Sequence, residues 1–230
     1  MFQKWYQLSL VSVLALTISV GAVENPTPAK KTNDAAKAKE APASDLVKIF
    51  KEKYGKITSI KADFAQTTFQ KALSKEKKAK GKTEIKKPGK FKWIVDAPDA
   101  STITTNGKKF WYYTPPFDAE DKGQLAIKSA SEMKSEIAFN LLTGKMNIDK
   151  EFSTKNLNAN SFEVTPKKKN DNYTNFAITA DPSSGMIQKL IINYTNGNIT
   201  TIEFSNVKLN EKIDDKTFNF DKPKNTVEVK

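Results

Sequence analysis

The chain has 230 residues, a length that fits one domain or two small ones, and 38% of them are apolar. It contains no Cys, no His and no Arg, so all 38 basic residues are Lys. These absences exclude disulfides, thiol nucleophiles, metals ligated by Cys or His, and catalytic triads built on His. The mean hydropathy is −0.57 and the only long apolar run is N-terminal, which excludes a polytopic membrane protein.

The formal net charge is +12 and the isoelectric point is near 9.5. Such a charge is typical of proteins that bind nucleic acid or anionic membrane surfaces, and it also occurs where it supports solubility alone. Direct base reading relies largely on Arg–guanine contacts, and the lysines here are spread along the chain. We therefore expect no nucleic-acid partner.

Residues 1–22 have the pattern of a cleaved secretory signal peptide. Lys4 is the positive charge, an apolar stretch runs from Leu8 to Val20, and small residues end at Ala22. The alternative, an uncleaved anchor, is disfavoured because the apolar run is short for a membrane span. Residues 23–43 are rich in Ala, Pro and Lys and predict a disordered tether, with a basic membrane-binding arm as the alternative. Residues 44–230 then form a single domain.

This domain is predicted to begin with a helix. Ser44 is a suitable N-cap, and apolar residues at helical spacing extend the helix to about Lys56. These apolar residues are Leu46, Phe50, Tyr54 and Ile57. Alternation over 60–69 then predicts a strand, the lysine-rich stretch 74–80 a solvated turn or loop, and Pro88-Gly89 a turn after 81–86.

Further strands follow this turn. Phe91, Trp93 and Val95 share one face of a strand that ends at Pro98. Segments 101–105 and 109–114 flank Asn106-Gly107, which is a strong hairpin signal.

A second helix interrupts the strands in mid-chain. Met133, Ile137 and Leu141 stand at i, i+4 and i+8, and Gly144 is placed as a stop, so the pattern predicts a helix over 131–142. Strands are expected again at 161–165, 173–180, 186–194 and 199–208, followed by a short element at 214–220 and a final strand at 227–229.

About ten strands and two helices predict a mainly β, α+β protein. We expect a curved antiparallel sheet or incomplete β-barrel, with an amphipathic helical lid over an apolar concave face. Patterning does not separate an ordinary packed core from a lined cavity, because both use the same aromatic residues. The aromatic residues expected on this face are Phe64, Phe91, Trp93, Trp111, Tyr113, Phe176 and Phe204.

Several runs resemble the LolA family of periplasmic lipoprotein carriers. Residues 86–93 (KKPGKFKW) and 105–115 (TNGKKFWYYTP) are similar to its basic–Pro–x–x–Phe–x–Trp and Asp-Gly–x–x–Leu–Trp–x–Tyr–x–Pro signature. Residues 45–70, with Phe64-Ala65-Gln66, resemble its first helix and strand. Residues 202–229, with the run FNFDKP at 218–223, resemble its closing strands. The resemblance covers about residues 45–229.

The resemblance implies a non-enzymatic periplasmic carrier with no cofactor and no metal. It would shelter the acyl chains of lipoproteins and move them from the inner to the outer membrane. The implied partners are acylated lipoproteins, an ABC-type exporter of the inner membrane and, where one exists, an outer-membrane lipoprotein acceptor; we expect a monomer. The implied cavity lining is Phe64, Phe91, Trp93, Ile103, Trp111, Tyr113, Phe176, Leu190 and Phe204. The implied lid residues are Met133, Ile137 and Leu141, and Lys87 would latch the lid.

The chain departs from the family pattern at two places. The family commonly has Arg before the Pro of the first signature, where it holds the lid through hydrogen bonds to the lid backbone. This chain has Lys87, which supplies charge without the planar guanidinium, so a weaker or different latch is expected. The family's Pro at the start of the lid helix is also absent here.

Two other functions compete with the carrier. One is a binding module or sensor of the same fold for another lipid or amphiphile. The other is an enzyme that uses only carboxylates, although Asp118, Glu120 and Asp121 have the pattern of an exposed acidic loop.

Overall fold

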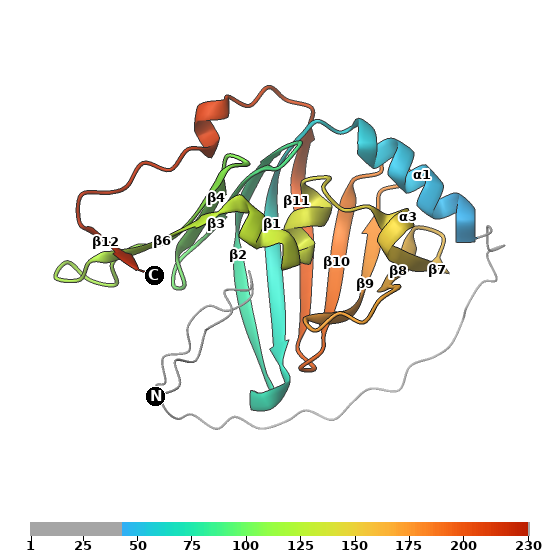
Figure 1. The fold of residues 1–230 in the computed structure, drawn as a ribbon, viewed down its shortest axis with the longest axis horizontal. Helices are drawn as coiled ribbons and strands as arrows, with labels where there is room; N and C mark the ends of the chain where they lie inside the picture. Colours follow the sequence, from blue (N-terminus) through green and yellow to red (C-terminus); the bar gives the residue numbers. More distant parts are fainter. Residues whose placement is uncertain (1–42, 230) are drawn as a thin grey trace.

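The computed structural model describes residues 43–229, and within them the side chains of residues 46–132 and 136–229. The predicted signal peptide and tether lie outside the described residues. A single curved sheet of twelve strands dominates the described chain (Figure 1). Its order is β12-β6-β5-β4-β3-β2-β1-β11-β10-β9-β8-β7. All neighbours are antiparallel except β12 and β6, which run parallel.

The first six strands are β1 (Ser59–Gln70), β2 (Lys75–Lys86), β3 (Lys90–Val95), β4 (Ser101–Thr105), β5 (Lys109–Thr114) and β6 (Gly123–Ser129). The other six are β7 (Phe152–Asn158), β8 (Ser161–Pro166), β9 (Tyr173–Ala180), β10 (Ile187–Tyr194), β11 (Ile199–Leu209) and β12 (Thr226–Val229). Because β7 and β12 are the two edges, the sheet is open, as the incomplete-barrel prediction required.

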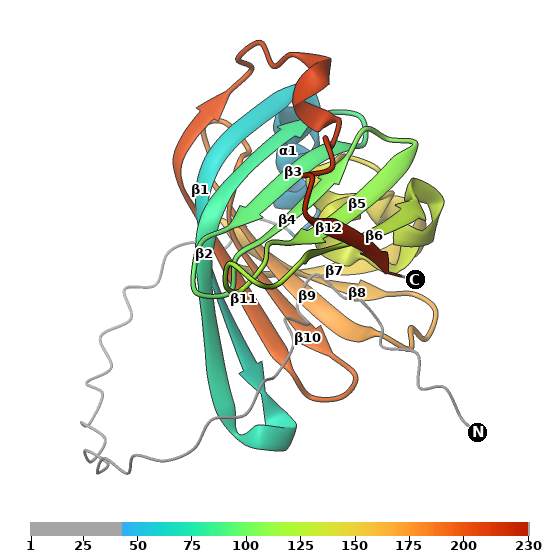
Figure 2. The same cartoon turned by 90° about the vertical axis from the view of Figure 1, so that its left-hand side faces the viewer.

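The α-helices are α1 (Ala43–Lys56), α2 (Ile137–Leu142) and α3 (Ile148–Glu151), and the 3₁₀-helices are η1 (Lys71–Leu73), η2 (Ala130–Ser135) and η3 (Asp215–Phe218). Figures 1 and 2 show α1, α2 and α3 on the concave side of the sheet. The first helix ends at Lys56 as predicted, and its apolar stripe is buried at Phe50 and Tyr54. Phe50 reaches Phe162 on β8, with ring centroids 5.2 Å apart, so α1 covers the β7–β9 half of the sheet.

The turn signals of the sequence are confirmed. Gly89 lies between β2 and β3, Gly107 lies between β4 and β5, and both have positive φ. The Asn106 carboxamide oxygen accepts the backbone N–H groups of Lys108 and Lys109 at 3.0 Å, which fixes the β4–β5 turn. Gly is favoured at position 107 because its φ of +90° is costly for other residues, whereas Asn106 contributes these side-chain hydrogen bonds.

Three expectations about secondary structure need correction. Residues 75–80 are strand rather than loop, because the β1–β2 ladder continues to the pair Gln70–Lys75. The helix expected over 131–142 is divided: η2 ends at Ser135, Glu136 is extended, and α2 begins at Ile137. The strands β6 and β7 and the helix α3 were not predicted at all.

Candidate functional site

The concave face of the sheet, here called the inner face, is apolar over most of its width. Phe64, Phe91, Trp93, Ile103, Phe176 and Leu190 are each at most 5% exposed and belong to one core cluster; Phe204 is half-buried and packs against it. The sheet register explains the grouping, since Phe64 lies opposite Phe204 on β11, and Trp93 lies opposite Ile103 on β4. The structure therefore brings most of the predicted lining residues together on one surface.

Aromatic rings form the centre of this inner face. The Phe64 and Trp93 rings stack with centroids 3.7 Å apart. Trp93 also stacks on Phe91 at 5.6 Å and meets Phe204 edge-on at 6.2 Å. Gly81 makes room for this stack, because a Cβ there would lie 3.0 Å from Cζ of Phe64 and 1.8 Å from the Ile94 carbonyl oxygen.

Two of the three predicted lid residues lie in a helix that packs against the inner face. Ile137 and Leu141 lie in α2, are less than 5% exposed and join the inner-face cluster. Phe139 was missed, although it is 1% exposed and meets the Phe91 ring edge-on at 5.6 Å. Met133 lies in η2, apart from α2, and its side chain is outside the described ones. Thus α2 is buried on nearly all sides, whereas the helical spacing of Met133, Ile137 and Leu141 predicted only one buried face.

Among the described residues Lys87 makes no direct hydrogen bond to α2, unlike the latch that the family resemblance implies. Its Nζ donates to the Tyr54 carbonyl oxygen at 2.7 Å and lies 3.4 Å from the centroid of the Tyr54 ring. The Tyr54 hydroxyl in turn donates to the Leu142 carbonyl at the end of α2, at 2.9 Å. Tyr54 therefore links Lys87 to the C-terminal end of α2 through two hydrogen bonds.

The surroundings of these two hydrogen bonds perturb both ionisable groups. Burial lowers the pKa of Lys87 from 10.5 to about 8, and burial raises the pKa of Tyr54 well above its usual value. The stem of Lys87 also lies under Gly144, where an added Cβ would come 3.3 Å from Cδ of the lysine. Gly144 follows the helix as predicted, with φ of +72°.

Trp111 and Tyr113 lie on the opposite, outer face of the sheet, so their assignment as lining residues is wrong. On β5 the core cluster takes Phe110 and, partly buried, Tyr112. Alternation along the strand turns the other two side chains outward, and Tyr113 contacts the Phe220 ring at 5.3 Å. The inner-face residues of β5 are therefore Phe110 and Tyr112.

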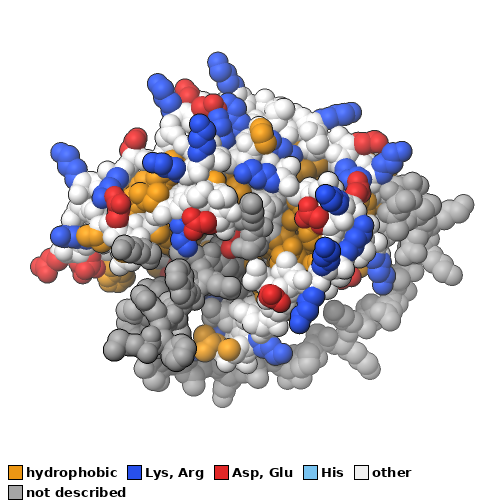
Figure 3. Space-filling model, in the orientation of Figure 1, with side chains coloured by type: hydrophobic (Ala, Val, Ile, Leu, Met, Phe, Trp, Pro, Cys, Tyr) orange, Lys and Arg blue, Asp and Glu red, His pale blue; other side chains and the backbone are white. Residues whose placement is uncertain are grey.

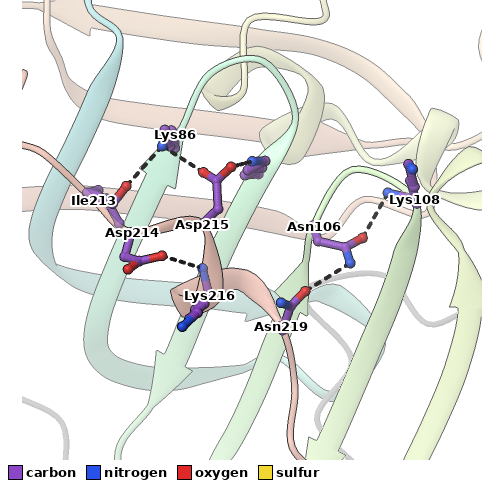
Figure 4. A network of polar contacts seen from close by, with 9 residues as sticks. Lys86, Asn106, Lys108, Ile213, Asp214, Asp215, Lys216 and Asn219 are labelled. Atoms are coloured by element: carbon purple, nitrogen blue, oxygen red, sulfur yellow. Dashed lines mark hydrogen bonds and ion pairs between the residues drawn. The ribbon is translucent and has the colours of Figure 1, made fainter.

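The C-terminal segment covers this outer face. Lys86 donates to the Ile213 carbonyl and to Asp215, which also pairs with Lys90 (Figure 4). Hydrogen bonds from these two lysines hold the pKa of the Asp215 carboxyl at about 2. Farther along, Asn106 donates to Asn219 at 3.1 Å, and β12 then pairs with β6. The segment buries Phe218 fully, so the outer face has an apolar contact of its own.

The lower inner face, towards the β1–β2 and β10–β11 turns, is polar. The Thr68 and Thr200 hydroxyls are 3.2 Å apart, and the Gln66 amide lies 3.4 Å from Thr68. Tyr194 faces the same region. Burial and the Glu136 carboxylate raise the pKa of its hydroxyl, and a hydrogen bond with Thr200 lowers it by less. The apolar surface therefore ends at a partly buried polar border.

In the view of Figure 3, Lys, Asp and Glu side chains are spread over this side of the molecule, and apolar side chains are visible between them. Asp118 is exposed and accepts the backbone N–H groups of Glu120 and Asp121, so the acidic loop folds on itself. Within residues 43–229 no helix is long and apolar enough to cross a membrane. The same residues contain no cluster of three Asp or Glu that could hold a metal ion.

The profile of the family described as "Outer membrane lipoprotein carrier protein LolA" matches residues 55–221 of this chain. The chain belongs to the LolA family. Outer-membrane lipoprotein carrier proteins are among its LolA relatives: one from Francisella tularensis subsp. novicida is 31% identical over 80% of this chain and 85% of that protein. One from Proteus mirabilis is 27% identical over 80% of this chain and 88% of that protein. A solved LolA superfamily protein from Nitrosomonas europaea has 12% identity and a TM-score of 0.45, covering 79% of this chain and 99% of that one.

Proposed function

We propose that this LolA-family chain carries the acyl chains of lipoproteins across the periplasm, from the inner to the outer membrane. The observation that supports this most is the aromatic inner face under a short apolar helix, with a polar latch at one end. Such an arrangement can hold an acyl chain without any catalytic group. The chain would act as a carrier and not as an enzyme.

The physical need for such a carrier is large. Burial of an acyl chain stabilises it by about 0.8 kcal/mol per CH₂, so one long chain represents on the order of 10 kcal/mol. A lipoprotein in water would expose that surface and aggregate. A dry apolar surface inside a protein removes this cost during transit.

The lid gives the empty carrier a way to cover the same surface. Phe139 lies against Phe91 where an arriving acyl chain would need to pack. In this proposal the α2 side chains and the cargo compete for the inner face, and the lid swings away when cargo enters. The short α2 and the divided helix before it supply a small unit that can move without breaking the sheet.

The remaining parts of the proposal concern compartment and partners. Residues 1–22 would direct export and then be removed, and the carrier would work in the periplasm. An ABC-type exporter in the inner membrane would supply the acylated cargo, and an outer-membrane acceptor or the membrane itself would receive it. The carrier would work as a monomer, because one sheet supplies the complete inner face.

The test is capture of cargo from the periplasm. The tagged carrier is isolated from cells that express an acylated lipoprotein, or its control with the acylated Cys changed to Ala. We expect the acylated form alone to copurify, and a Phe204→Gln variant to lose it while Trp111→Gln on the outer face retains it. Capture of both forms, or of neither, overturns the proposal. Mass spectrometry showing free lipids in place of lipoprotein would support the amphiphile-binding alternative.

A further inference from the structure

The β1–β2 hairpin projects beyond the other strands. Figures 1 and 2 both show its tip standing clear of the sheet and farther out than the β10–β11 turn. The two strands pair continuously from Ser59–Lys86 to Gln70–Lys75, and η1 closes the tip. A twelve-residue ladder makes this projection a firm part of the fold, so its exposed side chains are presented from a rigid support.

This hairpin carries a concentrated positive charge. Residues 71–82 contain six lysines and one glutamate, a formal charge of +5. Lys77 pairs with Asp99 at 3.1 Å. The other five are exposed and take part in no ion pair among the described residues: Lys71, Lys75, Lys78, Lys80 and Lys82.

The tip also exposes an apolar side chain. Leu73 is 57% exposed, which is more than any other large aliphatic side chain described, and its neighbours Ala72 and Ser74 are exposed as well. A leucine at the end of a rigid, lysine-bearing projection combines apolar and electrostatic attraction to a lipid surface.

We propose that the β1–β2 hairpin docks on an anionic lipid bilayer, with Leu73 at the boundary between headgroups and acyl chains and the lysines on lipid phosphates. Lysines on the tip and along the outer face suit the diffuse charge of a bilayer, because each acts as a point charge without fixed geometry. The docking is independent of the cargo: it needs neither the inner face nor the lid.

The proposal is tested with protein purified from the periplasm and vesicles of phosphatidylethanolamine and phosphatidylglycerol, with phosphatidylcholine vesicles as the neutral comparison. We expect binding to the anionic vesicles only, weakening as salt is added. The hairpin variant combines Lys71→Gln, Lys75→Gln, Lys78→Gln and Lys80→Gln. Its vesicle affinity should fall by about a hundred-fold or more, since each lysine near the surface contributes about fivefold. Leu73→Ala should lower the affinity by roughly fivefold.

A matched control separates the hairpin from net charge. The control variant combines Lys155→Gln, Lys168→Gln, Lys169→Gln and Lys212→Gln, which are all exposed and remove the same charge. The apolar control is Leu157→Ala, at a residue 48% exposed on β7. Both should bind vesicles nearly as the wild type does.

Three outcomes overturn the proposal: no binding of the wild type to anionic vesicles, equal loss in the hairpin and control variants, or full binding by the hairpin variant. In the last case, failure of that variant in lipoprotein transfer would assign the hairpin to an acidic protein partner. Because all substituted side chains are exposed, an unchanged melting temperature confirms that each variant is folded. Cargo capture in solution stays normal if only docking fails, so the carrier function is judged separately.

Discussion

Removing one hydroxyl from the latch should make the lid open more often. In Tyr54→Phe the ring stays in place, but the donor to the Leu142 carbonyl, 2.9 Å away in the wild type, is lost. Because Tyr54 is 6% exposed and Leu142 fully buried, the carbonyl loses its partner in a place that water does not reach. Such a loss costs about 1–3 kcal/mol, so about 2 kcal/mol shifts lid opening roughly thirty-fold.

This shift is measurable as affinity for a fluorescent long-chain fatty acid. If only the open lid admits the probe, its apparent affinity rises with the open fraction, towards thirty-fold for Tyr54→Phe. Amide exchange at Asn140 and Thr143 should accelerate as well. Their N–H groups bond to Glu136 and Phe139 within α2, and a helix of 6 residues is not stable once it leaves the inner face.

The matched control is Tyr173→Phe, on β9. Its hydroxyl makes no hydrogen bond among the described residues, so the probe affinity should stay at the wild-type value. The reasoning is refuted if Tyr54→Phe lowers the melting temperature but leaves probe affinity unchanged or weaker. That result would mean that the bond stabilises the whole fold without governing access to the inner face.

Three further predictions test other parts of the structure. The pKa of Lys87, measured by NMR of labelled lysine, should be near 8, and a midpoint near 10.5 contradicts the burial. The free energy of unfolding of the wild type, relative to that of Lys87→Met, should therefore rise between pH 8 and 10.5 by at most about 1.4 kcal/mol per pH unit. Gly81→Ala should lower the free energy of unfolding by more than about 2 kcal/mol, because the added Cβ meets the Ile94 carbonyl. Gly55→Ala, which adds its Cβ in open space, should be neutral or stabilising, and equal effects of the two substitutions would contradict the packing. Asp215→Asn should speed proteolysis of segment 210–229 at pH 7, and unchanged cleavage at pH 7 contradicts the anchoring role. Because the pKa of Asp215 is held at about 2, below its ordinary 3.8, the wild type should keep this protection above pH 3.8 and lose it progressively as the pH falls from 3.8 to about 2.

The hairpins and the first helix were predictable because their signals are local. Asn106-Gly107 and Pro88-Gly89 need particular backbone conformations at their own positions, and the apolar stripe of α1 repeats at helical spacing. The prediction of which residues of β3 face inward was also correct, because Phe91 and Trp93 alternate with lysines. In these segments the types of neighbouring residues are enough to predict which side chains are buried.

The face of β5 could not be read in this way. Phe110, Trp111, Tyr112 and Tyr113 are four consecutive aromatic residues, so alternation gives no contrast between the two faces. The choice comes from pairing with β4 and from the C-terminal segment, which brings Phe220 over the outer face. Both contacts join residues that are distant in the sequence.

The lid and the extended hairpin were misjudged for related reasons. The latch depends on Tyr54, whose helical spacing showed only that it would be buried. The lysine-rich half of β2 lacks alternation because both of its faces meet solvent, yet its backbone pairs fully with β1. The strand β7 has one buried apolar residue, Phe152, so its pattern was too weak to find.

Photo-crosslinking from the two faces of the sheet is the most direct test of acyl-chain carriage. A benzophenone side chain replaces either Phe204, half-buried on the inner face, or Trp111, half-buried on the outer face, and the carrier is irradiated with acylated lipoprotein. We expect crosslinks to the acyl chains from position 204 and none from position 111. Equal crosslinking from both faces, or crosslinking from position 111 alone, would contradict it.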